Sequence, residues 1–251
     1  MFIDIKDKVI IITGSSGGIG KELAIKFAEL GAKVVINGRK EEKIQEVYNI
    51  IKSRGCEPPL AIQANLRKYE NVENLINKTY EQYGKIDVLI NNAGGSFSAP
   101  AEEISANGWN AVIETNLSSV FYCSKAAFNI MRNQQHGGKI INISSVAAFL
   151  PDVHYSPYSA AKGGLNLLTE TLAVEWAKYN ILVNGIAPGF IDTKASINQG
   201  SGDTNEIALR RRGKPEDLFG AALLLVSDLS NYITGETIRV DGGLRGALRN
   251  V

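Results

Sequence analysis

The stretch from Lys8 to Lys40, "KVIIITGSSGGIGKELAIKFAELGAKVVINGRK", decides the fold. It opens with a β-branched run, turns at "TGSSGGIG", continues in a helical pattern and ends in a second β-branched run. Strand, helix and strand in this order predict a βαβ unit with two parallel strands. Gly14, Gly18 and Gly20 stand where the helix begins, and free backbone N–H groups together with the helix dipole favour an anion there.

The same alternation continues along the rest of the chain. Further β-branched runs, separated by segments long enough for helices, occupy residues 59–65, 86–92, 138–144, 181–187 and 236–241. This order predicts an α/β fold of the Rossmann type, a doubly wound and mostly parallel sheet with helices on both faces. Because no linker, repeat or low-complexity tract interrupts it, we expect residues 1–251 to form a single domain.

Composition excludes several classes of protein. Hydrophobic residues make up 44% of the chain and charged residues 21%, which predicts a globular protein with a sizeable core. A formal net charge of +1 favours no nucleic acid, membrane surface or acidic partner. Because no apolar run reaches the length of a membrane span and the N-terminal stretch lacks the layout of a signal peptide, we expect a cytoplasmic protein.

Cysteines and histidines give no sign of a metal site. Cys56 and Cys123 lie far apart, and His136 and His154 stand near neither of them. We expect neither zinc nor a disulfide, with Cys123 as a buried small hydrophobe. The basic run at residues 210–212 favours a solvated turn over a phosphate clamp.

Taken alone, the glycine turn is a weak signal. Its spacing is G-x-x-x-G-x-G, and such turns also simply let a helix pack close to a strand. Residues 14–18 moreover fit G-x-S-x-G, the nucleophile elbow of hydrolases. That alternative fails on topology, because only about a dozen residues precede Gly14 and the elbow needs an upstream strand and loop for its oxyanion hole. No histidine follows His154 to complete a triad.

The residues after the second strand favour one cofactor. An acidic residue there would bind the ribose hydroxyls of NAD, whereas Gly38 and Arg39 leave room for a 2′-phosphate and supply a planar donor. We therefore favour NADP(H) over NAD(H), although an exposed arginine at a strand end needs no ligand.

Polar motifs at predicted strand ends complete the pattern. "NNAGG" follows the fourth strand, "ETNLSS" holds Asn116, "NISS" ends the fifth strand and "YSAAK" contains Tyr158 and Lys162 one helical turn apart. With "TGSSGGIG", "VNGIAPGFIDT" and "GETIRVDGG", these motifs resemble the short-chain dehydrogenase/reductase family. The resemblance covers most of the chain and is closest to 3-oxoacyl-acyl carrier protein reductases and to small carbonyl or sugar dehydrogenases.

The resemblance implies an NAD(P)-dependent oxidoreductase that acts on CH–OH groups. Its catalytic tetrad would be Asn116, Ser145, Tyr158 and Lys162, with Ser145 preferred over Ser144 by the spacing to the tyrosine. The cofactor would contact Gly14, Ser15, Ser16, Gly18, Ile19, Gly20, Gly38, Arg39, Asn65, Leu66, Asn92, Ala93, Gly94, Tyr158, Lys162, Pro188, Gly189, Ile191 and Thr193.

The chain also departs from the family's pattern. Asn65 and Leu66 stand where an aspartate and a small apolar residue are usual. Many NADP-dependent members carry a basic residue within the glycine turn, where this chain has Gly17.

A catalytic tyrosine needs a lowered pKa. Ionising a phenol whose pKa is about 10 costs about 4 kcal/mol near neutral pH. A lysine charge about 4 Å away supplies about this much at an effective dielectric near 20. We therefore expect Lys162 to lower the pKa of Tyr158, with oxidised nicotinamide adding positive charge nearby, and to hold the nicotinamide ribose. Tyr158 would exchange a proton with the substrate oxygen, Ser145 would hydrogen-bond that oxygen and Asn116 would anchor a relay water. Standing alone, Tyr158 and Lys162 would be an ordinary helix-surface pair.

The substrate stays open at this level. Six apolar or aromatic residues flank the predicted site and indicate an apolar pocket for a small or medium ketone or for a 3-oxoacyl thioester. The same residues can equally belong to the core or to a subunit interface. They are Phe97, Phe149, Leu150, Val153, Tyr155 and Phe190. A polar loop or lid is expected at about residues 190–212, with a plain surface loop as the alternative. A sugar 1-dehydrogenase and a non-catalytic NADP sensor remain alternative functions. The family resemblance and a broadly apolar helix after Tyr158 predict a homotetramer.

Overall fold

A computed structural model of the chain describes residues 4–193 and 204–244. Its strands are β1 (Val9–Ile12), β2 (Lys33–Gly38), β3 (Leu60–Gln63), β4 (Val88–Asn91), β5 (Gly138–Ile143), β6 (Ile181–Pro188) and β7 (Thr237–Val240). Within the described residues they form one seven-stranded sheet in the order β3-β2-β1-β4-β5-β6-β7, and every neighbouring pair is parallel. The predicted Rossmann-type fold is confirmed.

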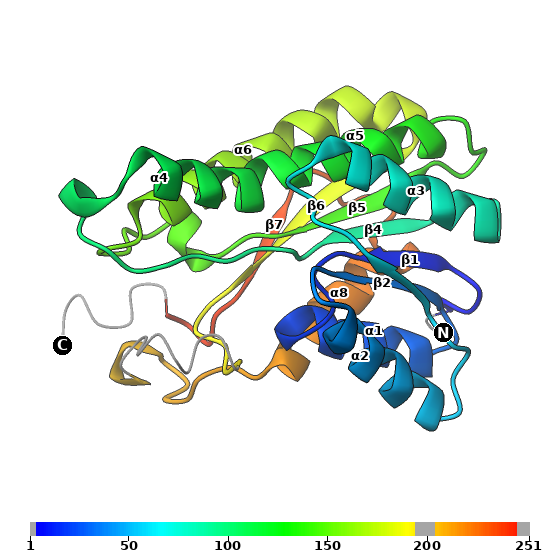
Figure 1. Cartoon of the computed structure of the whole chain (residues 1–251), viewed down its shortest axis with the longest axis horizontal. Helices are drawn as coiled ribbons and strands as arrows, with labels where there is room; N and C mark the ends of the chain where they lie inside the picture. The colour runs from blue at the N-terminus through cyan, green and yellow to red at the C-terminus, as the bar shows by residue number, and fades with distance from the viewer. Residues whose placement is uncertain (1–3, 194–203, 245–251) are drawn as a thin grey trace.

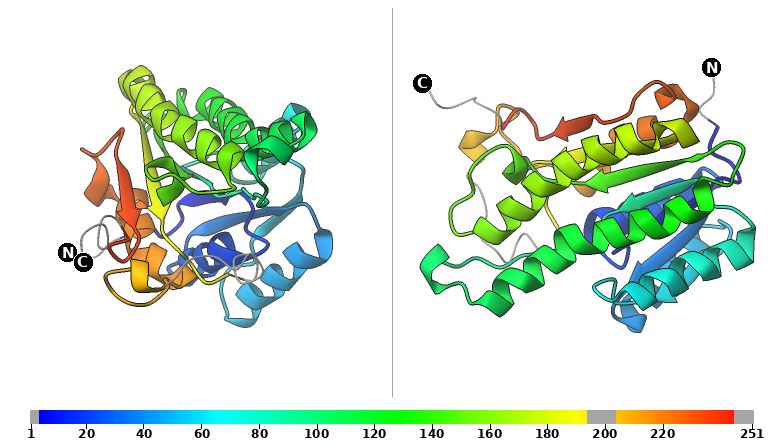
Figure 2. Two further views of the ribbon diagram at one scale, coloured as in Figure 1. Left: turned by 90° about the vertical axis from the view of Figure 1, so that its left-hand side faces the viewer. Right: turned by 90° about the horizontal axis from the view of Figure 1, so that it is seen from above.

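Helices cover both faces of the sheet (Figure 1). One face carries α1 (Gly18–Glu29), α2 (Glu41–Ser53) and α8 (Phe219–Val226). The other carries α3 (Tyr69–Tyr83), α5 (Ser119–Met131) and α6 (Ser156–Trp176). A π-turn at Glu114–Ser118 joins α4 (Ala106–Ile113) to α5, and α5 and α6 run side by side across the sheet (Figure 2).

Alternation along the strands explains why both faces are covered. Ile10 and Ile12 pack with α1, α2 and α8, whereas Val9 and Ile11 pack with α3, α5 and α6. All four side chains are fully buried. Successive strand residues point to opposite faces, so a strand that is apolar throughout needs a helical layer on each side. Each such burial stabilises the fold by about 1.5–3 kcal/mol relative to exposure.

The strand order fixes the position of the site. β1 lies between β2 and β4, so the chain crosses from one half of the sheet to the other beside β1. Ligands of open α/β sheets bind outside the carboxyl ends of the strands at this switch point. The glycine turn follows β1 there, and the Ser145 motif follows β5. Part of the predicted lid, residues 194–203, lies outside the described residues.

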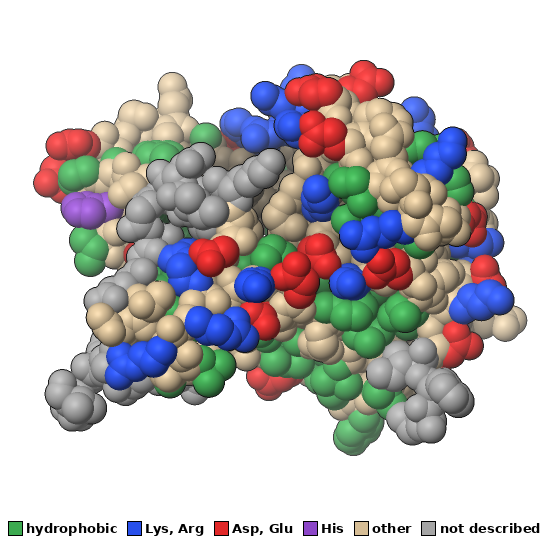
Figure 3. All heavy atoms as spheres, turned by 90° about the horizontal axis from the view of Figure 1, so that it is seen from below, with side chains coloured by type: hydrophobic (Ala, Val, Ile, Leu, Met, Phe, Trp, Pro, Cys, Tyr) green, Lys and Arg blue, Asp and Glu red, His purple; other side chains and the backbone are tan. Residues whose placement is uncertain are grey.

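The outer surface has a mixed charge. Figure 3 shows Lys and Arg interspersed with Asp and Glu on the face seen from below. Among the described residues, no helix is both long and apolar enough to cross a bilayer.

Candidate active site

β1 is followed by a turn that requires glycine. Gly14 and Gly18 have φ angles of 62° and 55°, in the left-handed region that side chains penalise. A Cβ atom on Gly14 would lie 2.7 Å from Ala93 Cα, so the turn touches the segment after β4. In the described part of the chain no side chain caps α1 at Gly17, so the first backbone N–H groups of the helix suit an anion.

Side chains from β1 and β4 brace this turn. Thr13 Oγ1 accepts hydrogen bonds from the backbone N–H groups of Asn92, at 2.9 Å, and Ala93, at 3.0 Å. Asn92 Nδ2 donates to the carbonyl oxygens of Thr13 and Gly14, at 2.9 and 3.1 Å. A Cβ on Gly20 would lie 2.3 Å from the same Nδ2. The Asn92 amide thus holds the glycine turn, and Thr13, which sequence reasoning missed, holds Asn92.

A second missed residue is Asn37, a buried amide in the apolar β2 strand. Its backbone N–H donates to Ser15 Oγ at 2.9 Å, and its Nδ2 donates to the Ile62 carbonyl at 3.0 Å. Ser15 Oγ in turn donates to the Ile12 carbonyl at 2.8 Å. The Ser15 backbone N–H also donates to the Asn37 carbonyl at 2.9 Å, so Ser15 ties β1 to β2 through both its side chain and its backbone. A polar residue within an otherwise apolar strand was the available signal.

The end of β2 brings Gly38 against the glycine turn. A Cβ there would lie 2.7 Å from Ser16 Oγ, so only glycine permits this approach. Arg39 follows with an exposed side chain, and its carbonyl accepts a hydrogen bond from Gln63 Nε2 at 2.9 Å. Ile19, in the first turn of α1, is partly buried against the core. The arginine therefore stands in solvent beside the turn.

Two predicted adenine contacts differ in their surroundings. Leu66 is buried in the core that underlies α3 and α5. Asn65 is partly buried, and its Oδ1 accepts a hydrogen bond from the Arg67 N–H at 3.3 Å. The Leu66 side chain packs inward, so only Asn65 retains a partly exposed polar side chain here.

The chain after β6 returns over the glycine turn. Pro188 ends the strand, and a Cβ on Gly189 would lie 2.8 Å from Asp241 Cα. A Cβ on Gly18 would lie 3.4 Å from Thr193 Cγ2. Gly189 thus lets the end of β6 lie close to Asp241, while Thr193 lies at ordinary contact distance from the start of α1.

Tyr158 and Lys162 lie one turn apart near the start of α6. Lys162 is 3% exposed, and its Nζ donates to the carbonyl of Ile143, the last residue of β5, at 2.7 Å. The same Nζ lies 5.5 Å from the centre of the Tyr158 ring. Burial lowers the pKa of Lys162 to about 8. Lys162 is therefore buried beside the Tyr158 ring at the end of β5, so the two residues do not form an exposed surface pair.

Of the two serines after β5, Ser145 is the one that reaches Tyr158. Its hydroxyl lies near enough to the Tyr158 hydroxyl to oppose the rise in the pKa of the phenol, and it accepts a hydrogen bond from the Ala147 N–H at 3.1 Å. Ser144 Oγ is hydrogen-bonded to Asn166 Oδ1 at 2.6 Å instead. The two hydroxyls of Ser145 and Tyr158 therefore face one point.

Asn116 lies in the π-turn between α4 and α5, a local break that often marks a functional site. Its Nδ2 donates to the carbonyls of Gly95, at 2.7 Å, and Val112, at 2.9 Å, and its Oδ1 accepts from the Gly95 N–H at 3.2 Å. A Cβ on Gly94 would lie 2.8 Å from Asn116 Oδ1 and 3.8 Å from Lys162 Nζ. The asparagine and the lysine thus converge at Gly94.

Comparison with known proteins agrees with this arrangement. The sequence model of the short chain dehydrogenase family matches residues 8–203. The chain is 36% identical over 251 residues to glucose 1-dehydrogenase 2 of Bacillus subtilis, covering 97% of each. It is also 36% identical over 251 residues to 3beta-hydroxysteroid dehydrogenase 1 of Eggerthella lenta, covering 97% of this chain and 96% of the relative. A short-chain type dehydrogenase/reductase from Mycobacterium marinum superposes with a TM-score of 0.93 at 31% identity, covering 97% of both chains.

The chain belongs to the short-chain dehydrogenase family. It is therefore an enzyme, an oxidoreductase of a family that uses NAD(P)(H). These matches do not single out the 3-oxoacyl-acyl carrier protein reductases.

The protein groups around Tyr158 in this dehydrogenase do not by themselves lower its pKa. Burial raises the pKa of the phenol above 10, the hydrogen bond with Ser145 opposes that rise, and the charge of Asp152 adds to it. Desolvation therefore outweighs the charge effect that the sequence suggested, and Tyr158 is protonated at neutral pH.

The aromatic residues expected to line the substrate pocket have other contacts as well. Phe97 packs on α4, because a Cβ on Gly108 would lie 3.0 Å from its Cζ. The Phe190 ring centre lies 5.7 Å from Arg212 Cζ, and the Phe149 ring centre lies 3.6 Å from Arg239 Cζ. Large apolar side chains also stay exposed in the short-chain dehydrogenase: Phe97, Phe149, Val153 and Leu209.

The basic run of this dehydrogenase is internally paired. Arg211 makes two hydrogen bonds to the Asp217 carboxylate, at 2.7 and 3.1 Å, and Arg212 pairs with Asp192. Ile191 forms an isolated parallel bridge with Gly213 in the same region. These ion pairs neutralise two of the three arginines, so the run is not built as a phosphate clamp.

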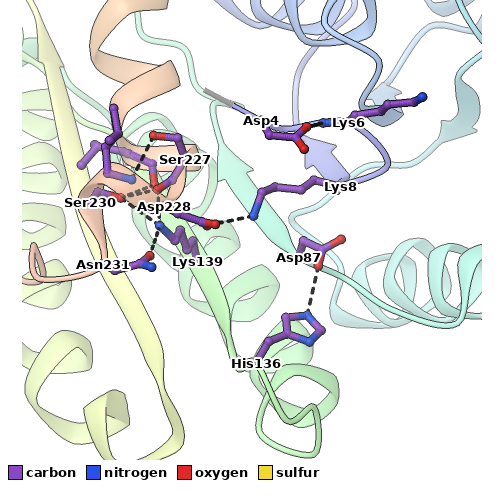
Figure 4. A network of polar contacts seen from close by, with 12 residues as sticks. Asp4, Lys6, Lys8, Asp87, His136, Lys139, Ser227, Asp228, Ser230 and Asn231 are labelled. Carbon is purple, nitrogen blue, oxygen red and sulfur yellow. Dashed lines mark hydrogen bonds and ion pairs between the residues drawn. The ribbon is translucent and has the colours of Figure 1, made fainter. Parts of the chain in front are cut away.

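A second polar cluster lies at the opposite edge of the sheet, beside the amino ends of β1, β4 and β5 (Figure 4). Asp87 Oδ2 accepts a hydrogen bond from the Val9 N–H at 2.7 Å, and Asp87 Oδ1 lies 3.0 Å from His136 Nε2. Lys139 donates to Ser230 Oγ and Asn231 Oδ1, each at 2.9 Å. Because the contacts satisfy these groups mutually, the cluster holds strand starts together in the dehydrogenase.

The two cysteines differ in burial. Cys123 is 1% exposed on α5, and burial raises the pKa of its thiol to about 12, so it is an inert hydrophobe as expected. Cys56 is partly buried. Within residues 4–193 and 204–244, no three His, Cys, Asp or Glu side chains gather in a metal-binding group.

Proposed function

We propose that this chain interconverts a ketone and a secondary alcohol with NADP(H), using Tyr158 as the acid and base. The convergence of Ser145, Tyr158, Lys162 and Asn116 at the carboxyl ends of the strands, beside an uncapped helix N-terminus, carries this proposal. Bound NADPH would supply the hydride that adds to the carbonyl carbon.

Each residue has a separate task in the proposed reaction. The Tyr158 hydroxyl gives its proton to the carbonyl oxygen during reduction and takes it back during oxidation. A pKa raised by burial keeps that proton in place at neutral pH, which suits reduction. Ser145 donates a hydrogen bond to the same oxygen, where negative charge develops. Lys162 holds the ribose of the cofactor, and Asn116 anchors a water through which the proton is replaced.

The glycine turn and Arg39 support a nicotinamide dinucleotide with a 2′-phosphate. The turn brings backbone N–H groups to a diphosphate, and Gly38 leaves room beside the exposed guanidinium of Arg39. We expect Arg39→Gln to raise KM for NADPH about tenfold, the worth of one charge-assisted hydrogen bond, and to leave KM for NADH unchanged. Initial rates with both coenzymes test this, and equal changes in the two KM values would exclude a phosphate contact.

The substrate we propose is a small or medium carbonyl compound or a 3-oxoacyl thioester. The exposed ring of Phe149, at the end of the turn that follows Ser145, supports a substrate with an apolar body, because such a side chain loses contact with water when the substrate binds. The relative named glucose 1-dehydrogenase supports a sugar 1-dehydrogenase as the second candidate. A panel of aliphatic ketones, aryl ketones, 3-oxoacyl thioesters and aldoses separates the two by kcat/KM.

Tyr158→Phe tests the chemistry directly. The variant keeps the ring and removes the proton, so turnover should fall by at least about a thousandfold while NADPH binding stays near wild type. Turnover follows from NADPH absorbance and binding from quenching of tryptophan fluorescence. Retained turnover would remove Tyr158 from its role, and oxidation of NADPH by no ketone at all would favour a cofactor sensor.

We further propose a cytoplasmic homotetramer built through the α5 and α6 faces. Leu167 and Val174 on α6 are 65% and 82% exposed, and Phe121 on α5 is 39% exposed. Burial of such side chains favours association. Light scattering tests it, and a monomeric mass would contradict it.

A further inference from the structure

Arg239 lies on β7, an edge strand of the sheet, beside the last residues of β6. It pairs with Ala187, the residue before Pro188. Ile238 and Val240, its neighbours along the strand, pack against the core below α1 and α8. Because side chains alternate along a strand, the Arg239 side chain points to the other face, toward α6 and the Ser145 turn.

On that face the guanidinium meets Phe149. Arg239 Cζ lies 3.6 Å from the centre of the Phe149 ring, the shortest cation–π distance among the described residues. A planar guanidinium stacked this closely constrains an aromatic ring in position and tilt. A lysine, which has a compact ammonium on a flexible stem, would not constrain it in the same way.

Other packing leaves the ring incompletely held. Phe149 is 39% exposed. It also borders a cavity of about 320 Å³ whose other walls come from α6 and β7, including Asn166, Leu167 and Thr237. A side chain beside a void loses contacts on that side. The stack with Arg239 is therefore a main restraint on the ring.

The ring ends the short turn that presents Ser145. The turn is a 3-10 helix, Val146–Ala148, which begins directly after Ser145 and ends at Phe149. The Ala148 N–H donates to the Ser145 carbonyl at 3.1 Å, and the Phe149 N–H donates to the Val146 carbonyl at 2.9 Å. Ser145 Oγ accepts from Ala147 inside the same turn. Movement at Phe149 therefore passes through one helical turn to the serine hydroxyl.

We propose that Arg239 is a positioning residue for the reaction, which holds the Ser145 hydroxyl in line with Tyr158 by stacking on Phe149. The inference rests on the proposed function, because it concerns the geometry at the carbonyl oxygen. Arg239 acts on the serine through Phe149 and the turn.

The test compares Arg239→Gln, Phe149→Leu and the double variant with the wild-type protein. Each single variant should lower kcat by about three- to tenfold, the range expected for a partly exposed cation–π stack. The double variant should be no slower than the slower single variant, since both remove one interaction. The deuterium isotope effect with NADPH labelled at the transferred position should rise, while the dissociation constant of NADPH stays at its wild-type value and the melting temperature falls by no more than about 4 °C, the shift that the loss of one such contact causes in a chain of this size.

Arg132→Gln is the matched control. Arg132 Cζ lies 5.6 Å from the Phe128 ring centre just past the end of α5, away from Ser145, so its loss should leave kcat unchanged. Arg239→Gln with wild-type kcat, additive losses in the double variant, or a loss of kcat that tracks the melting temperature would each overturn the inference. A wild-type protein inactive on every carbonyl compound would overturn the proposed function itself, whereas an active wild type with an equally active Arg239→Gln overturns only this inference.

Discussion

Replacing Gly94 by Ala should disable the site without touching any reactive side chain. Asn116 Oδ1 lies 2.8 Å from the position of the added Cβ, whereas ordinary van der Waals contact begins at 3.4 Å. Asn116 is fully buried and held by Val112 and Gly95, so the amide has no free space into which to withdraw. The added methyl group must therefore displace the amide or the strand end.

The loss of stability in Gly94→Ala can be worked out from the hydrogen bonds of Asn116 that the added methyl group would break. Asn116 makes hydrogen bonds of 2.7, 2.9 and 3.2 Å to the backbone of Gly95 and Val112. Losing one or two of them in a buried site costs about 1–3 kcal/mol of folding free energy. A shift of this kind next to Lys162 should also lower kcat by about tenfold to a hundredfold. Urea denaturation and initial rates of ketone reduction measure the two losses.

The adjacent glycine is the control. A Cβ on Gly95 would meet nothing within 4 Å, so Gly95→Ala should change the free energy of unfolding by less than about 0.5 kcal/mol and leave kcat near wild type. If Gly94→Ala were as stable and as active as Gly95→Ala, Asn116 would not be tightly held, and its role at the site would have to be abandoned.

Two further predictions concern buried charges. The pKa of Lys162 is about 8 in the fold against 10.5 for the free side chain, so its buried charge costs up to about 3 kcal/mol at neutral pH. Between these two pH values the unfolded chain keeps the proton on Lys162, whereas the folded chain loses it. As pH rises from about 8 to 10.5, the free energy of unfolding of the wild type should therefore increase relative to that of Lys162→Met. A difference between the two proteins that does not change with pH in urea denaturation would contradict this. Asp87 is 8% exposed and bonded to Val9, so Asp87→Asn should lose about 1–3 kcal/mol of stability with kcat unchanged. Asp228→Asn, at an exposed ion pair with Lys8, should lose less than about 1 kcal/mol by the same measurement, and equal losses would refute the burial argument.

The local pattern of the sequence was enough for the fold. A run such as residues 9–12, apolar at every position, must be buried on both faces, and it is followed by glycines with a positive φ angle and by a helix. These are constraints within one short segment, and each neighbouring segment repeats them. The two helical layers follow from joining such units by crossover connections, whereas the tertiary structure decided the strand order β3-β2-β1-β4-β5-β6-β7.

The sequence by itself also determined which residue types gather at the carboxyl ends of the strands, because strand ends in a parallel sheet share one edge. Only the tertiary structure decided what each of them does there. It turned the Asn92 amide onto the glycine turn, directed the Ser144 hydroxyl to Asn166, and raised the pKa of Tyr158 where spacing alone predicted a lower one. Hydrogen-bond partners and desolvation depend on atoms from distant segments, such as Gly94 beside Asn116 or Arg239 beside Phe149, whose approach no local pattern specifies.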